Sequence, residues 1–473
     1  MEKNKNSSLA YLTIIYMIGN FSSKVLSFVL VFFMTYFLTK EEVGEYDLIL
    51  TSISFLVPCI SLQIDSSLLR WLLDKNQSEK KDEIFENVFG LLFRNIAIYT
   101  VLYWILSFFI DWNHQLYLYI FSVLMMIFPT LQQGTRGIGK NRLYASTSVV
   151  YSLFFVFNTG IALYFFKSSV DGVLLANIIA LSGVIIWLFI KNDWWKYLRA
   201  KKIDSKLIKE LCEYSLPLLP NTLSWWLISA STRYVILGYL GKEYNGLFAI
   251  SYKIPTIVLV ITNVFTLAWQ EKVIKTSNQE EAETQFTNIL SGYVNLVMGV
   301  IIILVSCSKF MMQFIGKGYY ESWKYIPILL FAVFLQAISA FYGAAYLRAK
   351  QTKGILYSSI LGGVITISTS FFFVQYMGLY GISLSIMLGY LVLLIFRGIH
   401  VQHFLKIKFP IINTIILTII FIVLTSLLYV ENKWIFPLSV LISLIVFTIF
   451  NYKYIISLKS KVISKWKKSK SMA

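Results

Sequence analysis

Long apolar segments alternate with short polar connections along almost the whole chain. Each segment holds about 20 or more mostly apolar residues, enough for an α-helix to cross a hydrocarbon core about 30 Å thick. The pattern predicts an all-α polytopic membrane protein with about fourteen transmembrane helices. The predicted spans are 9–38, 46–70, 86–110, 115–135, 143–166, 171–191, 213–240, 245–270, 286–314, 324–348, 354–376, 379–399, 410–430 and 434–457.

A short motif occurs twice, after the first predicted span and again after the seventh. Residues Leu38–Tyr46 match Leu240–Phe248 at a spacing of 202 positions, with identical Leu, Lys, Glu and Gly, and Gly172 matches Gly381 at nearly the same spacing. Six spans separate the copies, so both halves insert in the same direction, as in parallel-repeat transporters. The predicted domains are a six-helix lobe at 1–191, a cytoplasmic interfacial linker at 192–212, a second six-helix lobe at 213–400, and spans 13–14 with a basic cytoplasmic tail at 401–473.

Composition supports a membrane location. Hydrophobic residues make up 57% of the 473 residues and charged residues only 14%, whereas a soluble domain carries about 25% charged residues. The three cysteines, Cys59, Cys212 and Cys307, have no metal-like spacing, so neither a disulfide framework nor a metal site is predicted. No cofactor is expected.

The net charge of +18 follows the predicted topology. Most lysines and arginines, Arg397 among them, fall in both termini or in connections after even-numbered spans, while few lie in the opposite connections. By the positive-inside rule, both termini are predicted to be cytoplasmic. We therefore expect a multi-pass membrane protein, with membrane lipids rather than nucleic acid facing its basic loops. Its Lys-, Ile- and Phe-rich composition is typical of an AT-rich bacterial genome, so the membrane is expected to be a bacterial cytoplasmic membrane.

Cationic side chains lie well inside the predicted spans, at Lys24, Arg94, Arg233 and Lys253. Each costs about 2.5–3.5 kcal/mol at the bilayer centre, so such residues usually face a wet cavity with a functional partner or lie near an edge. Acids at this depth are nearly absent, Asp65 being the nearest. Because an uncompensated buried cation needs an anion, we predict a pyrophosphate site formed by these four residues together with Arg70.

Each of these residues also has a structural interpretation. Lys24 and Lys253 are alternatively buried between helices and bonded to hydroxyl or carbonyl groups. Arg94 and Arg233 alternatively extend to the membrane interfaces, and Arg70 alternatively pairs with Asp65 or with lipid phosphate. Asp65 is the in-membrane candidate for ion coupling, with a local structural role as the alternative.

Aromatic residues gather around the seventh and eighth predicted spans and are candidates for a sugar-stacking wall: Trp225, Trp226, Tyr234, Tyr252 and Trp269. The alternative is that they face lipid or belong to the interfacial aromatic belt. Pro255 is a candidate for a bend in the eighth span, either at the site or as a packing kink.

Several segments carry a resemblance to a known family: Tyr214–Trp225, Arg233–Gly246, Phe248–Pro255, Ala268-Trp269, Asn20–Lys24 and Lys40–Tyr46. They resemble Wzx-type polysaccharide flippases, members of the MOP superfamily that also holds MATE exporters and the lipid II flippase. The resemblance implies two six-helix lobes in a V and a cationic cavity, a role that Lys24, Arg233 and Lys253 fit. The family often has Asp before the Arg-Tyr of span 7, whereas this chain has Thr232, which weakens any carboxylate-based coupling there.

The resemblance and the cations together predict a flippase for undecaprenyl-pyrophosphate-linked oligosaccharide. Its product is expected to serve the assembly of capsule, O-antigen or another surface polysaccharide. The expected protein partners are a polysaccharide polymerase or other assembly proteins. The alternatives are a MATE-like multidrug or other lipid-linked precursor exporter, and a non-catalytic scaffold of a polysaccharide assembly complex. An enzyme is not expected, because the outer loops are short and His114, His400 and His403 lie at or near loops without convergent partners.

Overall fold

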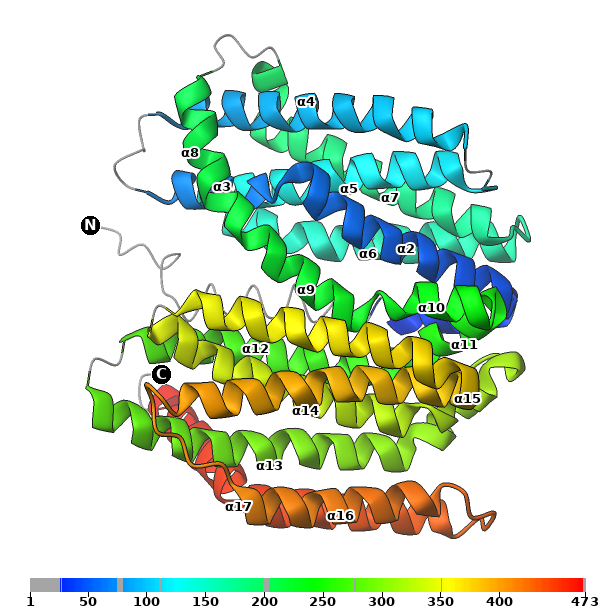
Figure 1. The fold of residues 1–473 in the computed structure, drawn as a ribbon, viewed down its shortest axis with the longest axis vertical. Coiled ribbons are helices and arrows are strands. Elements are labelled where there is room, and N and C mark those ends of the chain that lie inside the picture. The colour runs from blue at the N-terminus through cyan, green and yellow to red at the C-terminus, as the bar shows by residue number, and fades with distance from the viewer. Residues whose placement is uncertain are drawn as a thin grey trace. The chain divides into compact units, whose positions relative to one another are not determined.

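The fold is helical throughout the part of the chain that the structure describes (Figure 1). The computed structural model describes residues 26, 28–74, 80–109, 112–198, 204–275, 278–349 and 351–470, and these ranges contain no β-strand. Helices satisfy every backbone donor and acceptor within one segment, which a lipid environment requires. The predicted all-α fold class is confirmed.

The long helices are α2 (Lys40–Ser61), α4 (Lys81–Ser107), α5 (Gln115–Gly137), α6 (Asn141–Tyr164), α7 (Val170–Asn192), α12 (Lys253–Lys275), α13 (Gln279–Met311), α14 (Ile326–Arg348), α15 (Thr352–Val401), α16 (Ile411–Leu427) and α17 (Ile435–Lys470). The shorter helices are α3 (Ile64–Leu72), α8 (Ser205–Ser215), α9 (Leu219–Ser229), α10 (Thr232–Tyr239) and α11 (Lys242–Ser251). The 3₁₀ helices are η3 (Trp194–Leu198), η4 (Leu216–Leu218), η5 (Met312–Phe314) and η6 (Lys317–Lys324).

Within the described residues, nine helices are long and apolar enough to cross a membrane, or ten if α11 and the start of α12 form one bent span. The predicted number is higher because predicted spans are broken or merged. The seventh corresponds to two short helices, α9 and α10, and the eleventh and twelfth lie together in α15. Most of the first predicted span lies outside the described residues, so the number fourteen stays a prediction.

The 50 residues of α15 turn back on themselves at Gly378, whose φ of 53° and ψ of −130° break the helix. The two halves then pack closely, since a Cβ on Gly389 would lie 1.9 Å from Thr366 Oγ1 and one on Gly381 would lie 2.4 Å from the Phe373 carbonyl oxygen. The predicted break between spans 354–376 and 379–399 falls at this turn.

The contacts divide the chain into two compact units, Met1–Gly246 and Leu247–Ala473. Fully buried apolar side chains form a core in each, such as Leu68 and Leu181 in the first unit and Ile302 and Phe341 in the second. Large apolar side chains on α16 are exposed instead, as expected for a surface that faces lipid. The lobe boundaries predicted from the repeat stay a prediction.

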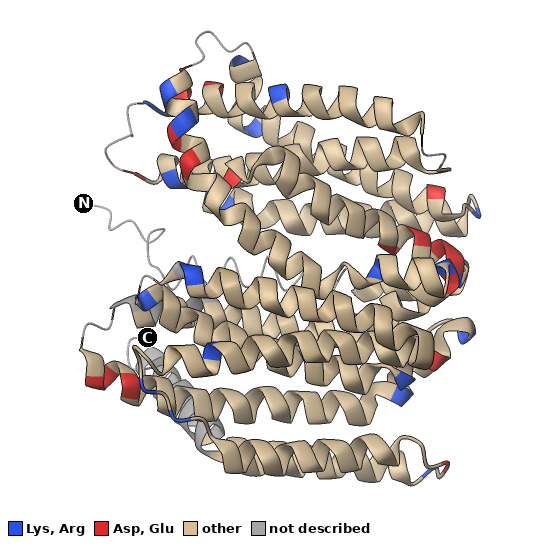
Figure 2. Cartoon of the chain, in the orientation of Figure 1, with Lys and Arg blue, Asp and Glu red and all other residues tan. Residues whose placement is uncertain are grey.

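Some aromatic side chains of the predicted interfacial linker are buried rather than exposed. Trp194 is buried and its ring lies 5.7 Å from that of Phe85, which also stacks on Tyr197 at 5.1 Å. Trp195 is exposed, and Lys196 reaches Asp82 at 3.4 Å. The linker is therefore anchored to α4. Charged residues elsewhere also lie mainly toward helix ends, as Figure 2 shows for the acidic start of α2.

Candidate functional site

Both copies of the repeated motif begin a helix. Thr39 and Glu42 form a capping box at the start of α2: the Thr39 hydroxyl accepts from the Glu42 N–H at 3.3 Å, and the Glu42 carboxylate accepts from the Thr39 N–H at 2.8 Å. The second copy turns at Gly241, whose φ of +91° favours glycine, before α11 begins at Lys242. The Lys-Glu-x-x-Gly sequence thus begins a helix in both copies, after a capping box in the first and after a glycine turn in the second.

The two copies meet each other through their glycines. A Cβ on Gly44 would lie 2.0 Å from the carbonyl oxygen of Lys242, and a Cβ on Gly246 would lie 1.9 Å from that of Lys40. The Asn245 side chain also donates to the Gly44 carbonyl at 2.8 Å. Only glycine permits this backbone approach. We call this contact, between residues 40–47 of α2 and 242–246 of α11, the repeat seam.

Ion pairs flank the repeat seam. Lys40 Nζ lies 2.8 Å from Glu243 Oε1 in an exposed pair, and Lys242 Nζ lies 3.2 Å from Glu45 Oε1 in a more buried one. The exposed pair contributes little stability, because solvent screens it. The Lys242–Glu45 pair is better shielded, since the Glu45 side chain is only 11% exposed.

Arg233, predicted to bind pyrophosphate, is buried beside the seam and has a carboxylate partner. Its side chain is 8% exposed, its Nε lies 3.3 Å from Asp47 Oδ2, and its guanidinium also donates to the Ser229 carbonyl. Asp65 was expected to be the acid nearest to the deep cations, whereas the acid that Arg233 contacts is Asp47. Asp47 was missed because it stands at the outer edge of the predicted span 46–70, where an acid looks like a loop residue.

Two of the predicted stacking residues, Trp226 of α9 and Tyr234 of α10, are hydrogen-bonded to α2. The Trp226 indole donates to the Thr51 carbonyl and to Ser54 Oγ, both at 3.1 Å, and the Tyr234 hydroxyl lies 2.8 Å from Ser52 Oγ. The two rings are 6.0 Å apart. These bonds fix α9 and α10 along α2 while leaving Tyr234 43% exposed. Trp225, the neighbour of Trp226, is half-buried.

The remaining cations of the first unit lie away from the seam. Arg70 is exposed in the last turn of α3, and Arg94 is exposed on α4. Asp65 follows the break between α2 and α3, where Leu62 and Gln63 both have φ of 53°. It lines a cavity of about 370 Å³ into which Gln63 and Thr222 also project, joined by a hydrogen bond of 2.5 Å.

The second unit contains the other predicted residues. Lys253 is half-buried at the start of α12, where the chain bends by 43° after α11 and Pro255 follows. Tyr252 lies at this bend, its ring 6.3 Å from that of Phe248. Trp269 is instead core, 3% exposed and stacked 4.9 Å from Phe341. Lys24 lies outside the described residues.

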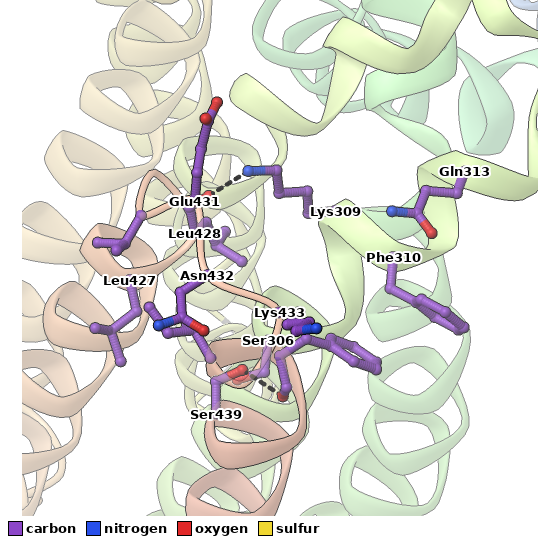
Figure 3. Close-up of a pocket in the computed structure, with 13 residues that line it drawn as sticks. Ser306, Lys309, Phe310, Gln313, Leu427, Leu428, Glu431, Asn432, Lys433 and Ser439 are labelled. Carbon is purple, nitrogen blue, oxygen red and sulfur yellow. Dashed lines mark hydrogen bonds between the residues drawn. The ribbon is translucent and has the colours of Figure 1, made fainter.

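A cavity of about 320 Å³ in the second unit lies between the end of α13 and the α16–α17 connection (Figure 3). Lys309 Nζ donates to the Leu428 carbonyl at 2.8 Å and lies 4.8 Å from the centre of the Trp323 ring. Phe310 stacks on Phe436 at 4.6 Å. These contacts fix the α16–α17 hairpin on α13, and none of the predicted site residues that the structure describes lines this cavity.

Two further assignments from the sequence need correction. Arg397 is no loop residue: it is 1% exposed inside α15 and donates to the Ser339 carbonyl and to the hydroxyls of Ser358 and Ser359 at 2.9–3.1 Å. His114 does have convergent partners, because its ring nitrogens lie 2.8 Å from Glu45 and 3.1 Å from Asp171. No spacing in the sequence links these three residues, which stand far apart in the chain.

The family model of the polysaccharide biosynthesis protein family matches residues 11–270, more than half of the chain. Comparison with curated protein sequences gives no significant match.

Among solved structures, the lipid II flippase MurJ in an inward closed conformation is 15% identical, with a TM-score of 0.71, and the match covers 94% of this chain and 99% of MurJ. An inward-facing MATE family transporter of the MOP superfamily is 13% identical, with a TM-score of 0.64 and coverage of 84% and 96%. A mutant of the Vibrio cholerae MATE transporter VcmN is 13% identical, with a TM-score of 0.59 and coverage of 83% and 95%. The fold is thus that of MurJ and the MATE transporters, and the chain belongs to the polysaccharide biosynthesis protein family, as its resemblance to Wzx-type flippases indicates.

Proposed function

We propose that the protein is a flippase that moves an undecaprenyl-pyrophosphate-linked oligosaccharide from the cytoplasmic to the outer leaflet of a bacterial membrane by alternating access. Membership of the polysaccharide biosynthesis family and a fold shared with a lipid flippase support this proposal. Both termini are proposed to be cytoplasmic, and a polysaccharide polymerase or another assembly protein is proposed to receive the product.

The Arg233–Asp47 pair is the observation that carries the proposal. A buried guanidinium needs an anion, and Asp47 supplies one while the repeat seam is closed. When α2 and α11 separate, the pyrophosphate of the substrate takes the place of Asp47. Arginine suits both partners, because its planar fork matches carboxylate and phosphate alike.

The other cations act before and during the transfer. Arg70 and Arg94 are exposed on α3 and α4, where they attract the pyrophosphate from the cytoplasmic side. Lys24 and Lys253 hold it in the membrane interior, with Trp226 and Tyr234 offering aromatic surface to the sugars. An inside-negative potential favours outward movement of the negatively charged head group, and the polyprenyl tail remains in lipid.

The test is export of surface glycan by cells that carry Lys253→Ala. We expect export to be lost at an unchanged level of membrane-inserted protein, because a point charge in the translocation path has been removed. Lys209→Ala, on the exposed side of α8, is the matched control and is expected to export normally. Normal export by Lys253→Ala would refute its role in binding the substrate.

A further inference from the structure

Two lysines line the cavity between the end of α13 and the α16–α17 connection (Figure 3). Lys309 lies in the last turn of α13, and Lys433 lies in the connection shortly before α17 begins. Within the part of the chain that the structure describes, neither lysine forms an ion pair with a carboxylate. Glu431, the acid on the lining, extends away from Lys433 in Figure 3. The lining therefore carries an excess of positive charge.

Lys309 is oriented by uncharged partners. Its half-buried side chain donates to the Leu428 carbonyl at 2.8 Å and lies 4.8 Å from the centre of the Trp323 ring. An ammonium group has three N–H donors, so the carbonyl uses one of them. Neither the carbonyl nor the ring carries a full negative charge. The position of the Lys309 ammonium is thus fixed at the cavity, while its charge stays uncompensated by protein.

Lys433 and two amide side chains add further donors to the lining. Lys433 is exposed, and its side chain has no hydrogen-bond or ion-pair partner among the described residues. The Asn432 side-chain oxygen accepts from the Trp434 N–H at 3.0 Å, so its amide nitrogen remains as a donor. Gln313 contributes a second amide from the end of α13 (Figure 3). Ammonium and amide donors around one cavity are suited to the oxygens of an anion.

The cavity lies where the polar connection meets the apolar surface of α17. Asn432 and Lys433 are exposed, and so are Leu438 and Leu441 farther along the helix. Between them stands Trp434, which is 72% exposed, and exposed tryptophans gather at the level of lipid head groups. The volume of about 320 Å³ is within the range of about 300–1,000 Å³ that small-ligand pockets have. Size, charge and depth thus agree with a lipid head group.

We propose that this cavity binds the phosphate head group of a membrane lipid, with Lys309 and Lys433 as its charged contacts. Lysine binds phosphate as a point charge, and the neighbouring apolar surface of α17 accommodates the lipid chain. In the proposed topology α13 ends at the outer face, so the lipid belongs to the outer leaflet. Its phosphate comes either from a phospholipid of that leaflet or from the pyrophosphate of a translocated glycan carrier. Only the second source rests on the proposed function.

A structural role for Lys309 is the alternative, because its bond to Leu428 ties α13 to the α16–α17 connection. That interpretation leaves Lys433 without a role, since its side chain has no hydrogen-bond or ion-pair partner in the described structure. The two interpretations therefore differ in what a substitution at Lys433 does. Its removal breaks no bond of the fold, so a change in ligand binding cannot be attributed to unfolding.

The test measures protection of a cysteine placed in the cavity lining. Val430→Cys, an exposed lining position, is introduced into the full chain after the three native cysteines, all free, are replaced by serine. The rate of labelling by N-ethylmaleimide is followed in mild detergent while phosphatidylglycerol, undecaprenyl pyrophosphate or inorganic pyrophosphate is added. Diacylglycerol serves as a lipid without a phosphate. We expect a phosphate-bearing lipid to slow the labelling, and diacylglycerol and inorganic pyrophosphate to slow it much less.

Variants identify the charged contact. Lys433→Ala should raise the lipid concentration that halves the labelling rate by about tenfold, the usual effect of losing one hydrogen bond to a charged group. Lys433→Arg keeps the charge and should protect as the parent chain does. Lys317→Ala is the matched control, because Lys317 is an exposed lysine of η6 in the same unit that does not line the cavity. It should leave the protection unchanged.

Protection that depends on Lys433 would support the proposal, and the more effective of the two phosphate lipids would name the source of the phosphate. Equal protection by inorganic pyrophosphate would make the cavity a site for a free anion, and equal protection by diacylglycerol would make it an apolar groove. Either result would overturn the proposal, as would unchanged protection in Lys433→Ala. Failure of the flippase assignment is a separate result: if protection depends on Lys433 but glycan export does not depend on Lys253, the lipid site stands and the assigned substrate path falls.

Discussion

Two buried arginines, one in each unit, are held by different chemistry. Arg233 is 6% exposed and contacts the carboxylate of Asp47, whereas Arg397 is 1% exposed and is surrounded by hydroxyl and carbonyl groups of Ser339, Ser358 and Ser359. A carboxylate can be exchanged for another anion when helices move. Several neutral acceptors, on α14 and on the first half of α15, must instead all separate from Arg397 on the second half. The first arrangement suits a contact that changes, and the second suits a fixed joint.

The largest effect is expected at the fixed joint. Arg397→Met should lower the free energy of unfolding by about 4 kcal/mol, because several buried acceptors lose their donor and each costs about 1–3 kcal/mol. Thermal unfolding in detergent, monitored by size-exclusion chromatography, would measure this loss of stability. A melting temperature equal to that of the wild type would mean that Arg397 is not a structural joint.

A smaller and reversible loss is expected at Arg233. Arg233→Met leaves the half-buried carboxylate of Asp47, whose side chain is 18% exposed, without its guanidinium, at a cost of about 3 kcal/mol. Because the cost comes from the stranded charge, Asp47→Asn in the same chain should restore at least half of the stability. A double-mutant cycle on melting temperature checks this, and simple additivity of the two changes would show that the pair is not coupled.

A substitution at the glycine contact is expected to change stability still less, but to change the width of the repeat seam. Gly44→Ala puts a methyl group 2.0 Å from the Lys242 carbonyl, so the seam must widen at a cost of about 1–3 kcal/mol. The distance between spin labels attached at Glu41→Cys and Tyr244→Cys, exposed positions on the two sides of the seam, should increase. Gly183→Ala on α7, where a Cβ would meet nothing within 4 Å, is the control and should leave that distance unchanged.

The smallest effect is expected at the exposed pair. Lys40→Gln removes the 2.8 Å contact with Glu243 but should change stability by less than about 1 kcal/mol, since solvent screens such pairs. The difference from wild type should vanish in high salt. A loss as large as that of Arg233→Met would mean that the edge of the seam, rather than its buried pair, holds α11 in place.

The fold was predictable because apolar length and turn residues act locally. Gly378 lies between two predicted spans, and the glycines of the repeated motif stand where helices approach. The break between α9 and α10 was not predicted, because the segment 213–240 as a whole is long enough for one span, although Ser229, Ser231 and Thr232 interrupt its apolar pattern there.

The site was predictable only in part. A charged residue within an apolar segment can be recognised from the sequence, so Arg233 and Lys253 could be identified as candidates. The partner of Arg233 could not be found, because Asp47 looks like an ordinary edge residue and pairs with a residue 186 positions away. The Glu45–His114–Asp171 cluster was missed for the same reason: it depends on which helix ends come together, and no spacing along the chain encodes that.

The repeat seam also has the symmetry of an interface between identical molecules. In a twofold dimer, residue i of one chain meets residue j of the other, and j meets i. Here the Lys40 carbonyl meets Gly246 and the Lys242 carbonyl meets Gly44, although all four residues lie in one chain. Unlike a dimer contact, this one does not weaken on dilution. A side chain gained at either glycine collides with the backbone of the other copy, so each of the two positions is restricted to glycine.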